Sequence, residues 1–577
     1  MSEPTRPLPP PIPLPDGGWS VHSFTSSKDF TIRGMALIPS NRVVPVIVVP
    51  GIMGTNLRAK RKPRPSSPVN EKNTKVEPGG VVWRPPNGMQ EGFEASNRWK
   101  NVSAADRQRL FDGPTLEVDD SGPVLLNDAD YGCLLTPADV RARGWGEVHA
   151  DSYGALLDVL EIRLNQTFAP NYQGVSVPRR YWQDVMACTP QQWGLREFEP
   201  LTLDHLKKHA QFYYPVYAVG YNWLHDCEVS SRRLEQRILE IIAFWTNHKR
   251  QCQQVILVTH SMGGLVARAC AKRIPDKIAG VIHGVMPALG APAAYRRLAC
   301  GTEGSSPDNG PLDDLAASRL ALILGETTEK TTPVLATSPG ALELLPNHLY
   351  PGPWLHVRVM TSVATPPASS GGHTNVAGYA PEKRDCLHLP NAKAPNPYDL
   401  YRDVNSWYRL INPALADPAG IFSEEKGGVK KAIRTAVDTA ERFHLTLGDY
   451  YHPHTYAFYG DDQHKRAYGQ VRWVAWQQAG ATTAVTAASV GAAGFLGHTA
   501  QGHRRVRLEG KSELLFGIEQ QDARGDGTVP QQSGTGPRGK VRQVFATKGY
   551  DHQGSYKHPD MLMLTLRLVV KIVQEMP

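Results

Sequence analysis

One segment constrains the fold of this 577-residue chain more than any other. Residues 255–258 (VILV) form a short apolar run, and residues 263–272 have the pattern of a helix that stops before Pro275. An apolar run of this kind is typical of a strand buried on both faces of a parallel sheet. Between the two stands Ser261, on a turn sharp enough to expose its hydroxyl at the edge of the sheet. We therefore predict that Ser261 is a nucleophile.

The neighbours of Ser261 fit this prediction with one departure. Residues two positions away on either side are crowded by the strand and the helix, so they are expected to be small. Gly263 meets this requirement, whereas Thr259 stands where a G-x-S-x-G pattern has its first glycine. The helix start directs backbone N–H groups toward the serine oxygen, which predicts the Met262 amide as an oxyanion donor. The alternative is that Ser261 only caps a helix.

A glycine-containing loop is the candidate for the second oxyanion donor. Residues 46–49 (VIVV) predict another buried strand, and Gly51 and Gly54 follow it closely. Glycines let the backbone approach a substrate. We predict the amide of Ile52 or Met53 as the second donor, with a plain tight turn as the alternative.

An acid and a base follow the serine in the order that a strand–turn–helix nucleophile requires. Asp526 lies between two glycines, and His552 lies in a loop ahead of a final amphipathic helix at residues 559–575. We predict His552 as the base and Asp526 as the acid that orients it. The alternatives are His558 as base, Asp522 as acid, and a simple turn role for Asp526.

Strand and helix patterns recur on both sides of Ser261. Residues 214–220, 278–285, 455–459 and 514–518 predict strands, and Ser230 or Ser231 is predicted to cap a helix. This alternation predicts an α/β fold with a mostly parallel central sheet and helices on both faces.

The domain organisation follows from where these patterns weaken. Residues 1–40 predict a Pro-rich tail with a lead-in strand, and residues 41–577 predict one catalytic domain. Two Pro- and Gly-rich stretches, at about 58–200 and 300–440, are predicted to be insertions that form a cap.

Composition and motifs exclude several classes of protein. The seven cysteines are scattered without a CxxC pair, which indicates a reducing compartment and no disulfide framework. Zinc, Walker and dinucleotide motifs are absent from the sequence, so no metal or cofactor is predicted. A cation site at Asp461, Asp462 and His464 is the weaker alternative to a polar loop.

Charge and hydropathy bear on the partners. The net charge is +8, and residues 58–64 (RAKRKPR) predict either a solvated loop or a contact with an anionic surface. The N-terminus lacks the build of a signal peptide, and no apolar stretch reaches 18 residues, so we expect synthesis in the cytoplasm. Residues 481–496 predict an insertion, or a lid that touches a membrane.

Four motifs together resemble the lecithin:cholesterol acyltransferase-like lipases. They are residues 48–57 (VVPGIMGTNL), 220–223 (GYNW), 260–268 (HSMGGLVAR) and 525–529 (GDGTV), in the order of that family. The family usually has Tyr-Asp-Trp at the second motif, so Asn222 is a departure. The two long insertions are not covered by the resemblance.

The resemblance implies an α/β-hydrolase with a triad of Ser261, Asp526 and His552 that acts on acyl esters of lipids or phospholipids. Several bacterial lipases of this type are antibacterial effectors of type VI secretion. This narrower relation implies a lipid substrate, transient membrane contact, a secretion-machinery carrier and an immunity protein, with no nucleic-acid partner. The alternatives are an acyltransferase and a non-enzymatic lipid- or partner-binding module on the same scaffold.

Overall fold

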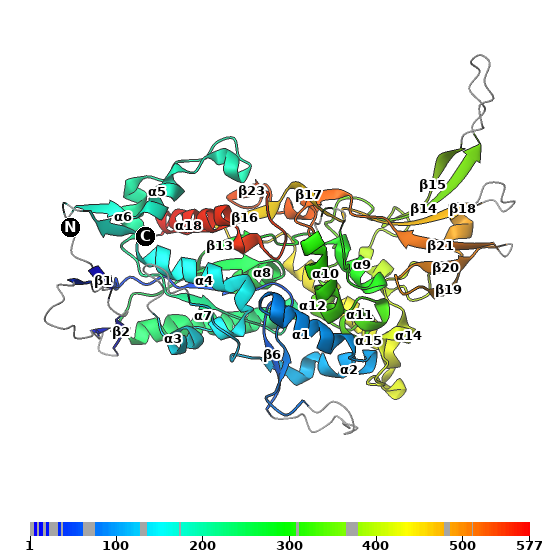
Figure 1. Cartoon of the computed structure of the whole chain (residues 1–577), viewed down its shortest axis with the longest axis horizontal. Helices are drawn as coiled ribbons and strands as arrows, with labels where there is room; N and C mark the ends of the chain where they lie inside the picture. The colour runs from blue at the N-terminus through cyan, green and yellow to red at the C-terminus, as the bar shows by residue number, and fades with distance from the viewer. Residues whose placement is uncertain are drawn as a thin grey trace, which may run out of the picture.

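Two six-stranded sheets organise the computed structural model of this chain (Figure 1). The structure describes residues 5–7, 11–14, 19–21, 33–35, 39–61, 76–126, 135–171, 173, 175–306, 308, 311–364, 379–477, 485–509 and 512–576.

The first sheet carries the predicted nucleophile. All its neighbouring strands run parallel, so its six carboxyl ends open on one edge. The predicted α/β class, with a mostly parallel central sheet, is confirmed. In spatial order the strands are β11 (Val216–Ala218), β5 (Val46–Val49), β12 (Val255–His260), β13 (Ile278–Gly284), β16 (Thr455–Gly460) and β23 (Gln543–Thr547).

Helices cover both faces of this sheet, as predicted. Alternate residues of β5 enter different cores: Val46 and Val48 pack with α4 and α18, whereas Ile47 and Val49 pack with α7 and α8. Side chains of a strand point alternately to its two faces, so a strand covered on both sides is apolar throughout. The helices are α4 (Ala150–Asn165), α18 (Pro559–Gln574), α7 (Cys227–Asn247) and α8 (Gly263–Arg273).

Helix α7 begins earlier than its sequence pattern suggests. Its N-cap is Asp226, whose carboxylate accepts the Val229 N–H at 2.7 Å. The predicted caps Ser230 and Ser231 are wrong, since both lie buried inside the helix. A carboxylate at the N-cap satisfies a free amide and also complements the helix dipole.

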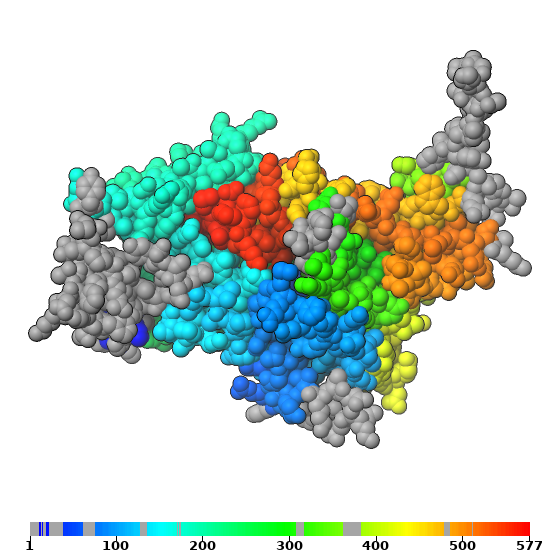
Figure 2. All heavy atoms as spheres, viewed as in Figure 1, coloured from blue at the N-terminus to red at the C-terminus, as the bar shows by residue number. Residues whose placement is uncertain are grey.

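The second sheet lies at the far end of the molecule from α4 and α5 (Arg180–Ala187), as the orange and cyan atoms of Figure 2 show. It draws strands from both sides of β16 in the sequence and packs its own aromatic core, including Trp407 and Trp473. The cap role of residues 58–200 and 300–440 stays a prediction. In spatial order the strands are β15 (Tyr379–Leu389), β14 (Leu355–Ala364), β18 (Val471–Gln477), β21 (Glu513–Ile518), β20 (Arg504–Arg507) and β19 (Gly494–His498).

An antiparallel pair joins the second sheet to the first. The chain leaves β16 through β17 (Asp462–Ala467) and returns through β22 (Ala523–Gly525), which pairs with it. This pairing brings Asp526 back to the carboxyl end of β16. A Cβ added at Gly460 would lie only 2.7 Å from the Asp526 Cβ, so the two backbones are in close contact.

Further elements lie around the two sheets. A small sheet of β6 (Leu57–Ala59), β7 (Val81–Trp83) and β8 (Leu116–Val118) flanks the loop after β5. The other helices of eight or more residues are α1 (Gly88–Lys100), α9 (Pro292–Cys300), α10 (Pro311–Leu324), α11 (Thr328–Leu335) and α15 (Gly428–Leu447).

Gly280 of β13 provides a test of how closely α18 packs on the sheet. A Cβ at this position would lie 2.7–2.8 Å from three side-chain atoms of Ile572. We expect Gly280→Ala to lower the free energy of unfolding by roughly 1–3 kcal/mol, because the added methyl group would overpack the core. Denaturant titration measures this change. The matched control is Gly92→Ala in α1, where no atom lies within 4 Å and alanine has the higher helix propensity. Equal stability of Gly280→Ala and the wild type would contradict this packing.

Candidate active site

Ser261 lies on a strained turn between β12 and α8. Its φ is +52°, a conformation that non-glycine residues adopt rarely, and its N–H donates to the Gly284 carbonyl at 2.9 Å. Gly263 is required here because a Cβ would lie 2.4 Å from the Pro50 carbonyl oxygen. The turn therefore holds the Ser261 hydroxyl at the carboxyl edge of the first sheet, where ligands of open α/β sheets bind.

Thr259, the departure from the glycine pattern, is accommodated by a polar partner. Its side chain is fully buried, and its Oγ1 lies 2.9 Å from His283 Nδ1. Burial lowers the pKa of His283 to about 3, so that ring is neutral and pairs with the threonine without a charge.

The structure brings Ser261, His552 and Asp526 into one hydrogen-bonded line. His552 Nε2 lies 2.8 Å from Ser261 Oγ, and His552 Nδ1 lies 2.8 Å from Asp526 Oδ2. The other carboxylate oxygen of Asp526 accepts the N–H groups of Thr528 and Val529 at 3.0 and 2.7 Å. The Asp526 carboxylate is buried and held from both sides, so it fixes the orientation of the imidazole.

The rival residues have other partners. His558 is the N-cap of α18 and accepts the Asp560 N–H at 3.3 Å. Asp522 accepts the Gly469 N–H at 2.8 Å and pairs with Arg472 at 2.6 Å. Among the described residues, the Ser261 hydroxyl has His552 as its partner and neither rival.

The loop after β5, residues 50–54, faces the serine and is called the β5 loop below. Trp83 Nε1 donates to the Met53 carbonyl at 2.8 Å, and the Tyr221 hydroxyl donates to the Pro50 carbonyl at 2.9 Å. Met53 has a φ of +61°. These bonds fix the loop through its carbonyl groups.

Three amides near Ser261 remain available to an oxyanion. The N–H groups of Gly51 and Gly54 are already used, by the Tyr153 hydroxyl and by the Gly51 carbonyl. Within the described part of the chain, the N–H groups of Ile52, Met53 and Met262 donate no hydrogen bond. These are the three amides predicted as oxyanion donors.

The remaining polar candidates are engaged elsewhere. Asp461 pairs with Arg524 at 3.1 Å, and Asp462 accepts the His464 N–H at 2.8 Å. Asp462 and His464 lie in strand β17, so the expected polar loop is wrong at these two residues. Among the residues that the structure describes, no cluster of three or more acidic, histidine or cysteine side chains could hold a metal ion.

The basic segment 58–64 begins with an engaged charge. Arg58 pairs with Glu117 at 2.9 Å and with Asp120 at 2.6 Å, so it is not free to bind an anionic surface. Residues 62–64 lie outside the described residues.

The segment 481–496 is described only from residue 485 onward. Its described part forms α16 (Ala487–Gly491) and the start of β19, at the edge of the second sheet. Within the described residues, no helix combines the length and the apolar composition that a membrane span requires.

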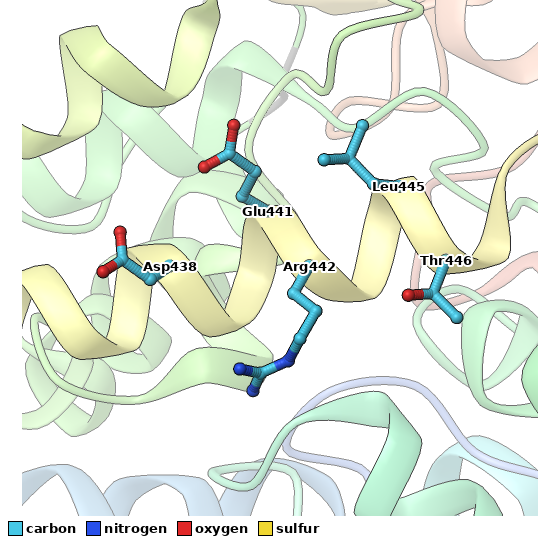
Figure 3. Close-up of a pocket in the computed structure, with 5 residues that line it drawn as sticks. All are labelled: Asp438, Glu441, Arg442, Leu445 and Thr446. Carbon is cyan, nitrogen blue, oxygen red and sulfur yellow. The ribbon is translucent and has the colours of Figure 1, made fainter.

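A hollow of about 370 Å³ lies on α15 and holds none of the candidate catalytic residues (Figure 3). Its two carboxylates, Asp438 and Glu441, are both paired with Arg402. The hollow therefore offers no free acid or base. It is lined by Asp438, Glu441, Arg442, Leu445 and Thr446.

Comparison with known proteins agrees with this geometry. Residues 224–302 match the family described as PGAP1-like alpha/beta domain, a span that includes β12, Ser261 and α8. The chain has the α/β-hydrolase fold. The predicted resemblance to lipases of this class is thereby confirmed.

Nearly the whole chain resembles a solved structure. A chain in the crystal structure of the Tle4–Tli4 complex aligns with 25% sequence identity and a TM-score of 0.69, over 92% of this hydrolase and 99% of that chain. Phospholipase PlaB from Legionella pneumophila in complex with thio-NAD aligns with 11% identity and a TM-score of 0.14, over 58% of this chain and 84% of PlaB. A score this low carries no weight for the fold. No curated protein matches the sequence significantly.

Sequence reasoning missed several residues that hold the site together. Trp83, Tyr153 and Tyr221 all contact the β5 loop, yet each lies far from it in the sequence. His260 was visible beside Ser261 as part of the motif, but its two hydrogen bonds join segments that no local pattern connects.

Proposed function

We propose that this hydrolase is a serine-dependent phospholipase that cleaves acyl esters of lipids and acts as a type VI secretion effector. The observation that carries the proposal is the hydrogen-bonded line from Ser261 through His552 to Asp526. A serine, a histidine and a buried carboxylate in this order perform acyl transfer on several unrelated folds.

The proposed reaction has two acyl-transfer steps. His552 Nε2 takes the proton of Ser261 as the serine oxygen attacks the ester carbonyl carbon. The Met262 amide and that of Ile52 or Met53 donate hydrogen bonds to the oxyanion that forms. When the tetrahedral intermediate collapses, the alcohol leaves with the proton from His552 and the acyl group stays on Ser261.

Water then resolves the acyl-enzyme by the same route. His552 takes a proton from water, the hydroxide attacks the acyl carbonyl, and the proton returns to the Ser261 oxygen as the fatty acid leaves. Asp526 keeps the Nδ1–H of His552 pointed away from the serine throughout, so that Nε2 is free to accept a proton.

The effector role and the partners rest on the similarity to Tle4. That chain was solved in a complex with Tli4, and this hydrolase covers nearly all of it. The match supports an immunity protein as the partner of this hydrolase and signal-independent delivery into a target cell. Neutralisation of the purified enzyme by a protein encoded beside it would be the direct test.

Hydrolysis of a phospholipid panel, with products identified by mass spectrometry, tests the proposed reaction. We expect free fatty acid and lysophospholipid from the wild-type protein, with product formation unchanged when an acceptor alcohol is added. Transfer of the acyl group to the acceptor in preference to water would establish an acyltransferase instead. No product and no covalent modification of Ser261 would leave only a binding module.

Dependence on a lipid surface is the second expected property. Burying an acyl chain contributes about 0.8 kcal/mol per methylene, so long-chain aggregated lipid is favoured over a soluble ester. We expect the initial rate to rise where the substrate passes its critical micelle concentration. Smooth saturation through that concentration, with a preference for short soluble esters, would identify a general esterase.

A further inference from the structure

Two buried side chains, Tyr153 and His260, join the loops that meet at Ser261. We infer that both are positioning residues, which hold the β5 loop and the loop after β23 in register with the nucleophile. The loop after β23, residues 548–554, carries His552 and is called the β23 loop below. The inference rests on the proposed function because it assigns both residues a part in the same reaction.

His260 bonds at both ring nitrogens. Its Nε2 lies 2.9 Å from the backbone carbonyl oxygen of His552, and a carbonyl can only accept, so Nε2 carries the proton. Burial, followed by the neighbouring His552 ring, lowers the pKa of His260 to about 3. The ring is therefore neutral, and its bare Nδ1 accepts the hydroxyl hydrogen of Tyr153 at 2.9 Å.

Tyr153 extends this path to the β5 loop. Its hydroxyl oxygen accepts the Gly51 N–H at 2.9 Å while its hydrogen is donated to His260. The path thus runs from the Gly51 amide through Tyr153 and His260 to the His552 carbonyl. Each bond has a fixed direction, because the amide can only donate and the carbonyl can only accept.

The backbone of Gly51 lies very close to His260 and Ser261, which explains why the hydrogen-bonded path between the two loops is short. A Cβ on residue 51 would lie 2.8 Å from His260 Nδ1 and 2.9 Å from the Ser261 Cβ. Only glycine lets the β5 loop come this near to both side chains. The same contact leaves the amides of Ile52 and Met53 as the free donors of the loop.

Helix α4, which carries Tyr153, contacts both loops through other residues as well. Near its start, the His149 N–H donates to the Gly54 carbonyl at 2.9 Å. One turn further, Ser152 Oγ accepts from Gln553 Nε2 at 2.5 Å, beside His552. The start of α4 is therefore a bridge from the β5 loop to the β23 loop, with the Tyr153 hydroxyl at its centre.

Loss of the Tyr153 hydroxyl leaves two polar groups unpaired in a buried site, the Gly51 N–H and His260 Nδ1. The β5 loop and the β23 loop then lose the hydrogen bonds that connect them through Tyr153 and His260. A displacement of about 1 Å in an active site can lower the rate by roughly 100-fold. We expect the loss in the reacting geometry and not in binding of the acyl chain, because Tyr153 and His260 are both buried behind the loops that they join.

The test compares two buried tyrosines of the same core. We expect Tyr153→Phe to lower kcat by roughly 10- to 100-fold with KM for micellar phospholipid little changed. The rate of Ser261 labelling by a fluorophosphonate should fall by a similar factor while the final extent of labelling stays complete. In the control, Tyr214→Phe, the lost bond is equally buried, from the hydroxyl to the His209 carbonyl at 2.9 Å, and kcat should stay at the wild-type value.

Variants of His260 separate positioning from packing. His260→Phe fills the space but removes both bonds, so its kcat should fall at least as far as that of Tyr153→Phe. His260→Gln places a side-chain amide donor within reach of the His552 carbonyl and should recover part of the loss. Recovery by glutamine is not expected if residue 260 serves only to fill volume.

The outcomes distinguish this inference from the proposed function. A wild-type kcat in Tyr153→Phe, or an equal loss in Tyr214→Phe, would overturn the positioning role while the nucleophile assignment stands. Failure of the wild-type protein to hydrolyse phospholipid or to be labelled at Ser261 would instead overturn the proposed function.

Discussion

Replacement of Ser261 by alanine is expected to lower ester hydrolysis by roughly a millionfold, the loss seen when subtilisin is deprived of its nucleophile. The oxygen that attacks the carbonyl is removed, whereas the fold should persist. Serine already places a Cβ at a φ of +52°, so alanine adds no backbone strain. The measurement is initial rate on a phospholipid, with circular dichroism and the thermal midpoint as checks of folding.

Covalent labelling gives an independent reading of the same variant. A fluorophosphonate reacts with an activated serine, so labelling of the wild type should disappear in Ser261→Ala. The matched control is Ser230→Ala, which removes a buried hydroxyl on α7 and should label as the wild type does. Labelling that persists in Ser261→Ala would place the nucleophile at another residue.

The centre of the first sheet was predictable because its residues are constrained locally. β12 and β5 are covered on both faces, so every residue of each is buried and the runs 255–258 and 46–49 are apolar throughout. The turn at Ser261 must pass between a strand and a helix within a few residues, which leaves a recognisable pattern of small neighbours. Patterns of this kind need no knowledge of distant contacts.

The second sheet was not predicted as a unit, although residues 514–518, which lie in its strand β21 (Glu513–Ile518), predict a strand and β14 also has a readable pattern. In β14 the described side chains of Leu355, Val357 and Val359 are buried, and those of His356 and Arg358 are not. This alternation is typical of a half-buried strand. It was missed because the flanking segments are rich in proline and glycine, and because β18 to β21 come only after β16 has returned to the first sheet.

The buried residues that connect the loops of the active site could not be predicted from local sequence patterns. Tyr153 bonds to Gly51 across 102 positions and to His260 across 107 positions. A tyrosine inside an amphipathic helix is ordinarily a core residue, and nothing beside Tyr153 in the sequence marks its hydroxyl as a partner of two loops. Such contacts are set by the packing of α4 on the first sheet, which only the folded structure specifies.

The choice between His552 and His558 leads to the second large expected effect. His552→Ala should lose nearly as much activity as Ser261→Ala, because His552 is the group that, among the described residues, lies within hydrogen-bond distance of both Ser261 and Asp526. His558→Ala should instead keep most activity. It removes the N-cap of α18, so its expected cost is about 1 kcal/mol of stability, measured by denaturant titration.

The double variant Ser261→Ala/His552→Ala makes this prediction stricter. Residues that act as one unit in a reaction are not additive, so the double variant should be no slower than Ser261→Ala alone. His558→Ala in the Ser261→Ala background should likewise add nothing to the loss of activity, but it should lower the unfolding midpoint as it does in the wild type. If His558→Ala abolished hydrolysis in the wild-type background while His552→Ala retained it, the base would be His558. The hydrogen bonds that connect Ser261, His552 and Asp526 would then belong to a resting state of the enzyme that is not the reactive one.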